Sequence, residues 1–436
     1  MQKKFLGMAV AAALAMPAVA LAQSAVQVYG TVHMSLNQAK YTKDTAGTVN
    51  DVTKMGVTSH ASNWGLRSTE TLGGGMTAWF QAEFNMKMAR DNGVHDGDST
   101  ARNSGVGLRG GFGNVYLGTW ETPWAQTFRL WDVGTIGGWG PVTSIIGRRE
   151  NTGTNPSRNC SNVVGASGGT LPDPAVNAAG TVTGAAQPIC GNGAEATANA
   201  VGYALWRRFS YAVFYESPLF EGVQAKIAWQ PNERKSDFTA PNATATPTTP
   251  ITVNENPSAW SASLTWTGLG GRARAFGATM QNKDWTTVGQ TDSGYTFGGG
   301  YDFGMANVGA TYETFKYKAA AGDVEAKQWG VGVAVPMGPG KIGASYAKAK
   351  KLTGAGTDAA EAAGTNDTGA KMWNLGYEWA LSKRTALGFG IAKIDNGANQ
   401  VFSWTAALPI QNGTTSGSVL AGTDVTNIFV SMRHSF

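Results

Sequence analysis

The sequence predicts an all-β protein, a 16-stranded antiparallel transmembrane β-barrel. Three observations carry this prediction. Segments in which apolar and polar residues alternate recur along the chain. Short and long connections alternate between these segments, as they do in outer-membrane barrels. The last segment alternates up to a terminal Phe436, which falls on the same apolar face as Val430 and Met432, so we expect the final strand to be embedded in the barrel.

The N-terminal residues 1–22 have the features of a cleaved export signal. Two lysines precede an apolar run at 5–19, and the residues A-L-A at 20–22 form a small-residue cleavage box. The alternative is a transmembrane anchor, but the short run and the cleavage box favour a signal peptide. We therefore expect an exported barrel domain that spans 23–436.

The composition excludes several classes of protein. Only 14% of residues are charged, below the roughly 25% of soluble domains. Mean hydropathy is −0.19, and no long apolar stretch follows the signal, which argues against a helical membrane protein. The net charge of +5 includes no basic run outside the signal, so we expect no nucleic-acid partner. The 59 glycines and 15 tryptophans fit a barrel between lipid and water.

Sixteen alternating segments have lengths close to those that span a bilayer at a tilt. In chain order they are 26–37, 62–71, 76–88, 101–110, 114–120, 206–217, 222–230, 258–267, 272–282, 294–302, 306–318, 327–336, 341–350, 371–380, 385–395 and 424–436. The seven short connections predict periplasmic turns, and the longer ones, such as 38–61, predict external loops. An even number of strands places both termini on the periplasmic side.

Alternation also assigns faces to the predicted strands. A charge that faces lipid at the bilayer midplane costs about 2–4 kcal/mol, so we expect Glu83 and Arg208 to point into the lumen. A barrel of this strand number encloses an aqueous channel. On the strand at 206–217 we expect one apolar face that consists of Phe209, Tyr211, Val213 and Tyr215.

Several motifs, taken in order, resemble the trimeric general porins of Gram-negative bacteria, most closely the β-proteobacterial type. They are V-Q-V-Y-G at 26–30, W-G-L-R-S-T-E-T-L-G-G-G at 64–75, F-G-N-V-Y-L-G at 112–118, Y-E-W-A-L-S-K-R-T at 377–385 and R-H-S-F at 433–436. The resemblance implies a homotrimer in the outer membrane through which small hydrophilic solutes diffuse passively. It also implies that the third external loop, here 121–205, folds into the lumen and constricts it.

The resemblance further implies roles for individual residues. Arg67 and Arg208 match lumen-facing family positions and would form a basic wall, with Asp132 on the loop as an opposing acid. Four more loop residues are candidates for the constriction: Trp124, Arg129, Arg148 and Arg149. The family signal to the outer-membrane assembly machinery would be the terminal Phe436.

The chain departs from the family at several pore positions. His33 stands where an aspartate is common, and Asn63, Thr119 and Phe214 stand where arginines are common. The basic wall is thinner and one acid is missing, so we expect only a weak anion preference. His33 itself is either a pH-sensitive pore residue or one more polar lumen group, and we favour the second.

The loop at 121–205 divides into two parts. The second part, 151–200, holds Cys160 and Cys190 and reads as an insertion at the outer mouth. An oxidising periplasm favours a disulfide between them, with two free thiols as the alternative. No other cysteine and no histidine lies near, so we expect no metal site.

The first part of the loop is rich in tryptophan. These rings could bind sugars or aromatic acids, because flat rings stack and Arg pairs with carboxylates, which would make a substrate-specific channel. Alternatively, they pack the loop onto the barrel wall, and we favour this interpretation. A structural or adhesive protein is a third possibility. No nucleophile with a partner histidine and no phosphate-binding glycine loop is evident, so we expect neither an enzyme nor a cofactor.

Lipid is the remaining expected partner. Lys348, Lys350 and Lys351 end a predicted strand near the headgroups of the outer membrane. They either mark that depth only or pair with the phosphates of lipopolysaccharide.

Overall fold

The computed structural model describes most of the predicted barrel. The described residues are 26–42, 51–86, 88, 102–147, 208–231, 236–241, 250–255, 258–283, 289–319, 322–364, 366–404, 411–412, 415–416 and 421–436. The predicted signal peptide at 1–22, the predicted pore residues Arg148 and Arg149, and the predicted disulfide partners Cys160 and Cys190 lie outside these residues.

The strands follow one another with the alternation of short and long connections seen in the sequence. Their bounds are β1 Gln27–Tyr41, β2 Val52–Ser59, β3 Asn63–Gly73, β4 Met76–Asn85, β5 Ser104–Gly110, β6 Gly113–Glu121, β7 Arg208–Glu216, β8 Val223–Gln230, β9 Ser236–Pro241, β10 Pro250–Glu255, β11 Ser258–Gly268, β12 Ala273–Lys283, β13 Thr291–Asp302, β14 Asn307–Ala319, β15 Gly322–Met337, β16 Gly340–Ala349, β17 Ala370–Ala380, β18 Thr385–Asn396, β19 Gln411–Asn412, β20 Thr415–Ser416 and β21 Val425–Ser435.

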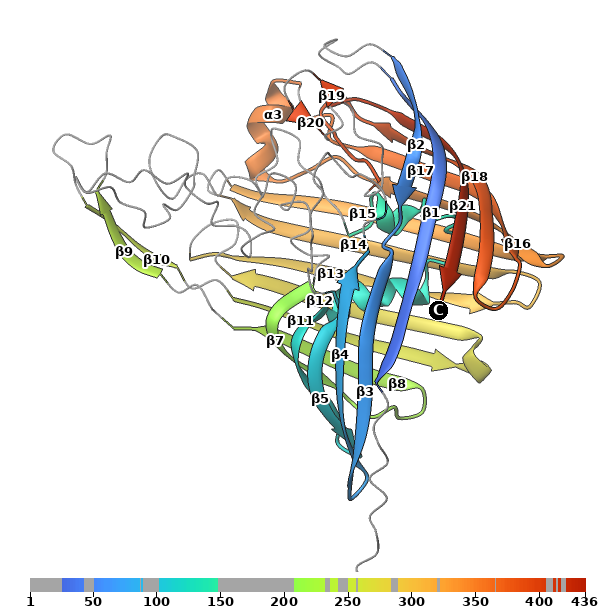
Figure 1. Cartoon of the computed structure of the whole chain (residues 1–436). Coiled ribbons are helices and arrows are strands. Elements are labelled where there is room, and N and C mark those ends of the chain that lie inside the picture. The colour runs from blue at the N-terminus through green and yellow to red at the C-terminus, as the bar shows by residue number, and fades with distance from the viewer. Residues whose placement is uncertain are drawn as a thin grey trace, which may run out of the picture.

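Within the described part of the chain, seventeen strands form one antiparallel sheet that closes on itself (Figure 1). The closing seam joins the first strand to the last, with Thr31 opposite Ser435 and Tyr41 opposite Val425. The seam confirms that the C-terminal strand completes the barrel beside the N-terminal one. Two small hairpins, β9–β10 and β19–β20, stand apart from this sheet.

The barrel has sixteen strand positions among the described residues, because β2 and β3 share one position beside β1. Residues Met34–Tyr41 of β1 pair with β2, whereas Gln27–Thr31 pair with β3. The prediction that 38–61 is a loop is wrong at both ends, because β1 extends to Tyr41 and β2 occupies Val52–Ser59. Val52–Ser59 continues the second strand upward beyond a break at which Ala61 has a φ of 48°.

The outward face carries exposed apolar side chains at every second position. On β15 and β17 these include Val331 and Leu375, which are 40% and 50% exposed. The predicted apolar face of β7 holds for Tyr211, Val213 and Tyr215, but Phe209 is fully buried. The φ of Tyr211 is 52°, and this irregularity changes the phase of the alternation, so Phe209 leaves the outward face.

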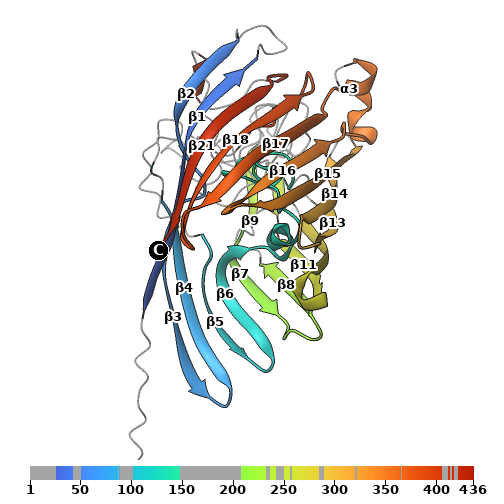
Figure 2. The same ribbon diagram turned by 90° about the vertical axis from the view of Figure 1, so that its right-hand side faces the viewer.

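Helices are short and lie in the connections. They are α2 Pro123–Gln126, η1 Thr127–Leu130, η2 Pro141–Thr143, η6 Leu269–Gly271, η7 Ala355–Thr357 and α3 Asp358–Ala362. In the described ranges we find no helix with the length and apolar character needed to cross a bilayer. The teal segment that contains α2 runs between the curved walls of strands (Figure 2).

Candidate functional site in the lumen

The segment that follows β6, residues 122–147, begins with a short capped helix. The Thr122 hydroxyl accepts a hydrogen bond from the N–H of Ala125 at 3.2 Å, and Pro123 occupies the first turn, where no N–H partner is needed. This geometry turns the chain sharply inward at the end of β6. We call residues 122–147 the inner segment.

Hydrogen bonds tie the inner segment to inward-facing side chains of three strands. The N–H of Gly147 donates to Glu313 Oε2 on β14 at 2.7 Å. Gln328 Nε2 on β15 donates to the Ile145 carbonyl at 2.9 Å, and Asn374 Nδ2 on β17 donates to the carbonyl of Gly134 at 3.1 Å. These bonds satisfy buried backbone groups that would otherwise be costly, so they fix the segment on the wall.

A close backbone approach reinforces this contact. A methyl group placed on Gly134 would lie 2.0 Å from the carbonyl oxygen of Ala344 on β16. Only glycine allows the two backbones to come so near. The inner segment is therefore pressed directly against the wall over β14 to β17.

The tryptophans of the inner segment are packing residues. Trp124, Trp131 and Trp139 are each at most 1% exposed. Trp124 stacks on Phe315 at 5.5 Å between ring centroids, and Trp139 meets the rings of His60, Trp404 and Phe429 at 4.8, 5.4 and 6.0 Å. The rings of these tryptophans pack against other residues of the protein, which supports the packing interpretation. They are not exposed to stack on a sugar or an aromatic acid.

Charged side chains gather on the opposite part of the wall, over β3 to β7. We call this set the arginine cluster; its members are Arg67, Arg102, Arg129, Arg208, Glu83 and Glu121. Arg102 contacts Glu83 at 2.7 Å, and Glu121 contacts both Arg129 at 2.6 Å and Arg208 at 3.2 Å. Four arginines against two glutamates leave a formal surplus of two positive charges.

The surplus charge lies where water reaches it. Arg67 is exposed; its Nε donates to the neutral Gln27 Oε1 at 2.9 Å, and its guanidinium lies 4.9 Å from the centre of the Tyr29 ring. The Arg129 side chain is 50% exposed although it pairs with Glu121. Glu83, by contrast, accepts hydrogen bonds from Arg102 and from the Tyr29 hydroxyl. Cations are therefore the more accessible members of the cluster.

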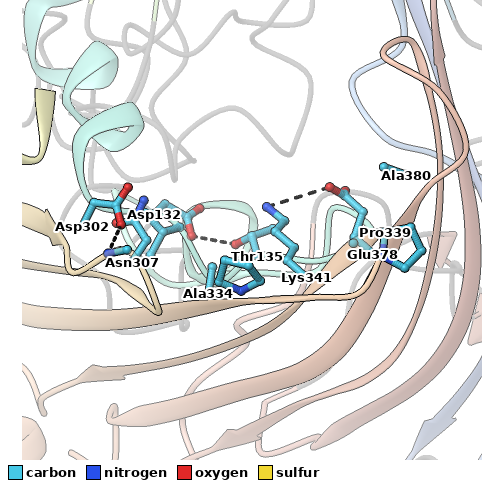
Figure 3. Close-up of a pocket in the computed structure, with 13 residues that line it drawn as sticks. Asp132, Thr135, Asp302, Asn307, Ala334, Pro339, Lys341, Glu378 and Ala380 are labelled. Carbon is cyan, nitrogen blue, oxygen red and sulfur yellow. Dashed lines mark hydrogen bonds and ion pairs between the residues drawn. The ribbon is translucent and has the colours of Figure 1, made fainter.

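Asp132 lies elsewhere, in a cavity of about 530 Å³ between the inner segment and the turn end of β13 to β17. Figure 3 shows it beside Thr135, whose hydroxyl donates to Asp132 Oδ1 at 2.7 Å, with Lys341 and Glu378 across the cavity. Burial raises the pKa of Asp132 to about 6. The structure thus brings Arg67 and Arg208 into one cluster but sets Asp132 apart from it.

His33 packs within the wall. Its ring centroid is 5.0 Å from that of His60, and its backbone N–H donates to the hydroxyl of Ser62 at 2.9 Å. His60 Nε2 shares a hydrogen bond with the Ser35 hydroxyl at 2.7 Å, and the His60 ring contacts the ring of Trp139 in the inner segment. The two histidines therefore meet where β2 breaks off and β3 begins.

The sequence analysis did not identify Arg102 and Glu121 as site residues. The signal was present in the hairpin of β5 and β6. A tight turn at 110–113 places Ser104 opposite Thr119, which carries residues 102–103 toward residue 121. Arg208 Nε completes the link by donating to Asn103 Oδ1 at 2.9 Å. Extending the predicted register past the strand ends would have found this group.

Comparisons with known proteins agree on the kind of barrel. A family model described as Gram-negative porin matches residues 9–399. Outer membrane porin protein 32 of Delftia acidovorans is 27% identical over 441 residues, the full length of both chains. Among solved structures, the anion-selective porin from Comamonas acidovorans is 24% identical and has a TM-score of 0.59, covering 95% of this chain and 100% of its own. The trimer form of OmpT from Vibrio cholerae is 13% identical with a TM-score of 0.54, covering 95% and 99%.

Proposed function

Since the chain belongs to the Gram-negative porin family, we propose that its outer-membrane channel gives small hydrophilic anions a weak preference over cations. Solutes pass without chemical change, so the protein is a passive channel and not an enzyme. The observation that carries the preference is the arginine cluster, with its surplus of two positive charges and its exposed Arg67. The anion-selective porin from Comamonas acidovorans, of similar fold, supports it.

The preference is weak because most of the cluster is paired. Glu83 and Glu121 each contact an arginine directly, and ion pairs at close range project little field into water. A salt gradient across a planar bilayer tests the proposal. We expect a reversal potential with the sign that anion selectivity produces, and we expect its magnitude to shrink as the salt concentration rises. A reversal potential of the opposite sign, which indicates cation selectivity, would refute the proposal. Current block by micromolar amounts of one solute would instead favour a substrate-specific channel.

The inner segment is proposed to be the constriction. It occupies lumen space beside the wall and presents Arg129 on the side of the arginine cluster. We propose that the whole stretch 121–205 acts with it, and that Cys160 and Cys190 form a disulfide in the inserted part. The mass of the mature chain tests two predictions. A gain of two hydrogens on reduction would support the disulfide, and a mass that lacks residues 1–22 would support removal of the signal peptide.

A homotrimer is the proposed assembly. Structures of similar fold include the trimer form of OmpT from Vibrio cholerae. Mobility on a detergent gel that increases only after boiling, together with the mass of the unboiled particle, would support three copies. A particle with the mass of one chain would rule the trimer out.

Phe436 is the proposed signal to the assembly machinery of the outer membrane. Its N–H donates to the Gly30 carbonyl at 3.0 Å, and its carbonyl accepts from the Gly30 N–H at 3.2 Å, while the side chain stays 45% exposed. An exposed ring on a fixed backbone is available to a receptor. Deletion of Phe436 should lower the amount of inserted protein more than it alters the conductance of channels that still form.

A further inference from the structure

The cavity between the inner segment and the turn end of β13 to β17 is lined by inward residues of neighbouring strands. Asp302 lies opposite Asn307 across β13 and β14, and Lys341 lies opposite Glu378 across β16 and β17. Between these two pairs, β15 contributes the small side chain of Ala334. The inner segment closes the other side, so the small side chain leaves room between two polar ends (Figure 3).

One end of the cavity carries two carboxylates without an ion-pair partner. Asp132 Oδ1 accepts the Thr135 hydroxyl, and Asp302 Oδ1 accepts a backbone N–H of its own turn at 2.8 Å. Among the described residues no cation forms an ion pair with either carboxylate. Arg274 of the neighbouring β12 instead donates a hydrogen bond to Asn307 Oδ1. With this arginine counted, the acid end keeps a surplus of one negative charge.

The other end of the cavity carries a surplus of one positive charge. Glu378 lies 3.8 Å from Lys341 Nζ and 3.5 Å from Arg433 Nη2, so one acid is shared between two cations. The Lys341 side chain is 38% exposed and therefore remains accessible to a solute. The cavity with its immediate partners is thus neutral overall, but its negative and positive charges lie at opposite ends.

A neutral cavity with separated charges complements a neutral ligand with separated charges, whereas a simple cation or anion would satisfy only one end. The volume of about 530 Å³ lies within the range of about 300–1,000 Å³ that small-molecule sites occupy. We propose that this cavity binds a free α-amino acid as its zwitterion, with the ammonium group between Asp132 and Asp302 and the carboxylate on Lys341. The proposal rests on the channel proposed above only for the passage of the amino acid through the lumen.

Three ligands of related structure test the assignment on the mature protein in detergent. L-alanine carries both charges, ethylamine lacks the carboxylate, and propionate lacks the ammonium group. Because charge-assisted hydrogen bonds are the strong ones, each single-charge ligand should bind about tenfold more weakly than L-alanine in a ligand-observed NMR titration. Equal affinity of the three ligands, or no saturable binding of L-alanine up to about 100 mM, would overturn the proposal.

Substitutions at the two ends should affect different ligands. Asp132→Asn keeps an oxygen that accepts the Thr135 hydroxyl but removes the charge, so it should weaken L-alanine and ethylamine about tenfold and leave propionate no weaker. Lys341→Gln should weaken L-alanine and propionate and leave ethylamine no weaker. The matched controls, Asp358→Asn in α3 and Lys383→Gln in the turn after β17, remove the same charges away from the cavity and should bind all three ligands as the parent does.

Gel mobility that changes on boiling verifies that each variant is folded. In a folded variant, an equal loss of affinity for all three ligands would overturn the assignment, because it would show that the two ends do not recognise separate charges.

The pH dependence of binding is a readout that a packing role of Asp132 would not change. Burial raises the pKa of Asp132 to about 6, and an ammonium group requires the ionised carboxylate. L-alanine stays zwitterionic between about pH 7 and about pH 5, so its affinity for the parent should fall about tenfold over this range. The affinity of Asp132→Asn should stay constant, and a parent affinity that does not change with pH would overturn the role of Asp132. Both proteins share the other charged groups around this carboxylate, which are Asp302, Lys341, Glu378 and Arg274.

A failed amino-acid site is distinguishable from a failed channel. The same preparation is inserted into a planar bilayer. Anion-selective conductance without binding of L-alanine would overturn the site and leave the channel, whereas binding of L-alanine without conductance would support the site and overturn the channel.

Discussion

Replacing Arg67 by glutamine should reduce the ratio of anion to cation permeability about threefold at 0.1 M salt. The side chain is exposed and its hydrogen-bond partner Gln27 is neutral, so its charge is not cancelled locally. A charge about 7 Å from the path of an ion contributes about 0.6 kcal/mol in water, and screening at 0.1 M leaves about half. Anions lose this attraction and cations lose the same repulsion. The free-energy difference between the two kinds of ion in the pore therefore changes by about 0.6 kcal/mol, which corresponds to a permeability ratio lower by close to threefold.

The same arithmetic predicts the salt dependence. At 1 M salt the screening length falls to about 3 Å, and the effect of the substitution should shrink to about 1.2-fold. The assay is the reversal potential of single channels in a threefold gradient of potassium chloride, repeated at low and high concentration. Lys383→Gln removes one charge from the turn between β17 and β18 and serves as the control. A ratio that stays the same at 0.1 M, or that changes equally at both concentrations, would refute the electrostatic argument.

Three further predictions concern the inner segment. Asp132 has a raised pKa of about 6, so its negative charge disappears as the pH falls through that value; anion preference should rise on acidification, and Asp132→Asn should abolish this dependence of the reversal potential. Trp139→Ala should cost about 3–5 kcal/mol in unfolding free energy and make single-channel currents noisier, because the ring fills a site between His60, Trp404 and Phe429. Gly138→Ala should lower the melting temperature and shift the inner segment while Trp139 stays in its site. The φ of Gly138 is 84°, and a methyl group there would lie 2.6 Å from His60 Nδ1. An unchanged melting temperature would contradict this.

The strand count and the short turns were predictable because each hairpin is a local feature. Alternation within some ten residues fixes a strand, and a tight glycine turn fixes its partner, as at 110–113 between β5 and β6. Two phase changes escaped prediction. Ala61 and Tyr211 adopt positive φ values that flip the alternation within a strand, and nothing in the residue types announces this. These flips hid β2 and moved Phe209 to the buried side.

The contacts of the inner segment were beyond reach from the sequence for a different reason. Gly134 meets Asn374, and Gly147 meets Glu313, across separations of 240 and 166 residues. Periodicity carries no information about partners so far apart. The tryptophans of the segment predicted that it packs on something, and only the closed barrel identifies the wall of β14 to β17 as the surface it covers.

The seam between β1 and β21 has a consequence for the order of assembly. Trp139 packs on both sides of it, since His60 lies on the strand position next to β1 and Phe429 lies on β21 itself. Its binding site therefore exists only after strands from the two ends of the chain have met. Seating of Trp139 must therefore follow barrel closure, whereas the contacts of Gly134 and Gly147 with β14 to β17 do not depend on the seam. Fluorescence of Trp139 would then report the joining of the two chain ends, a late step of barrel formation that conductance alone does not resolve.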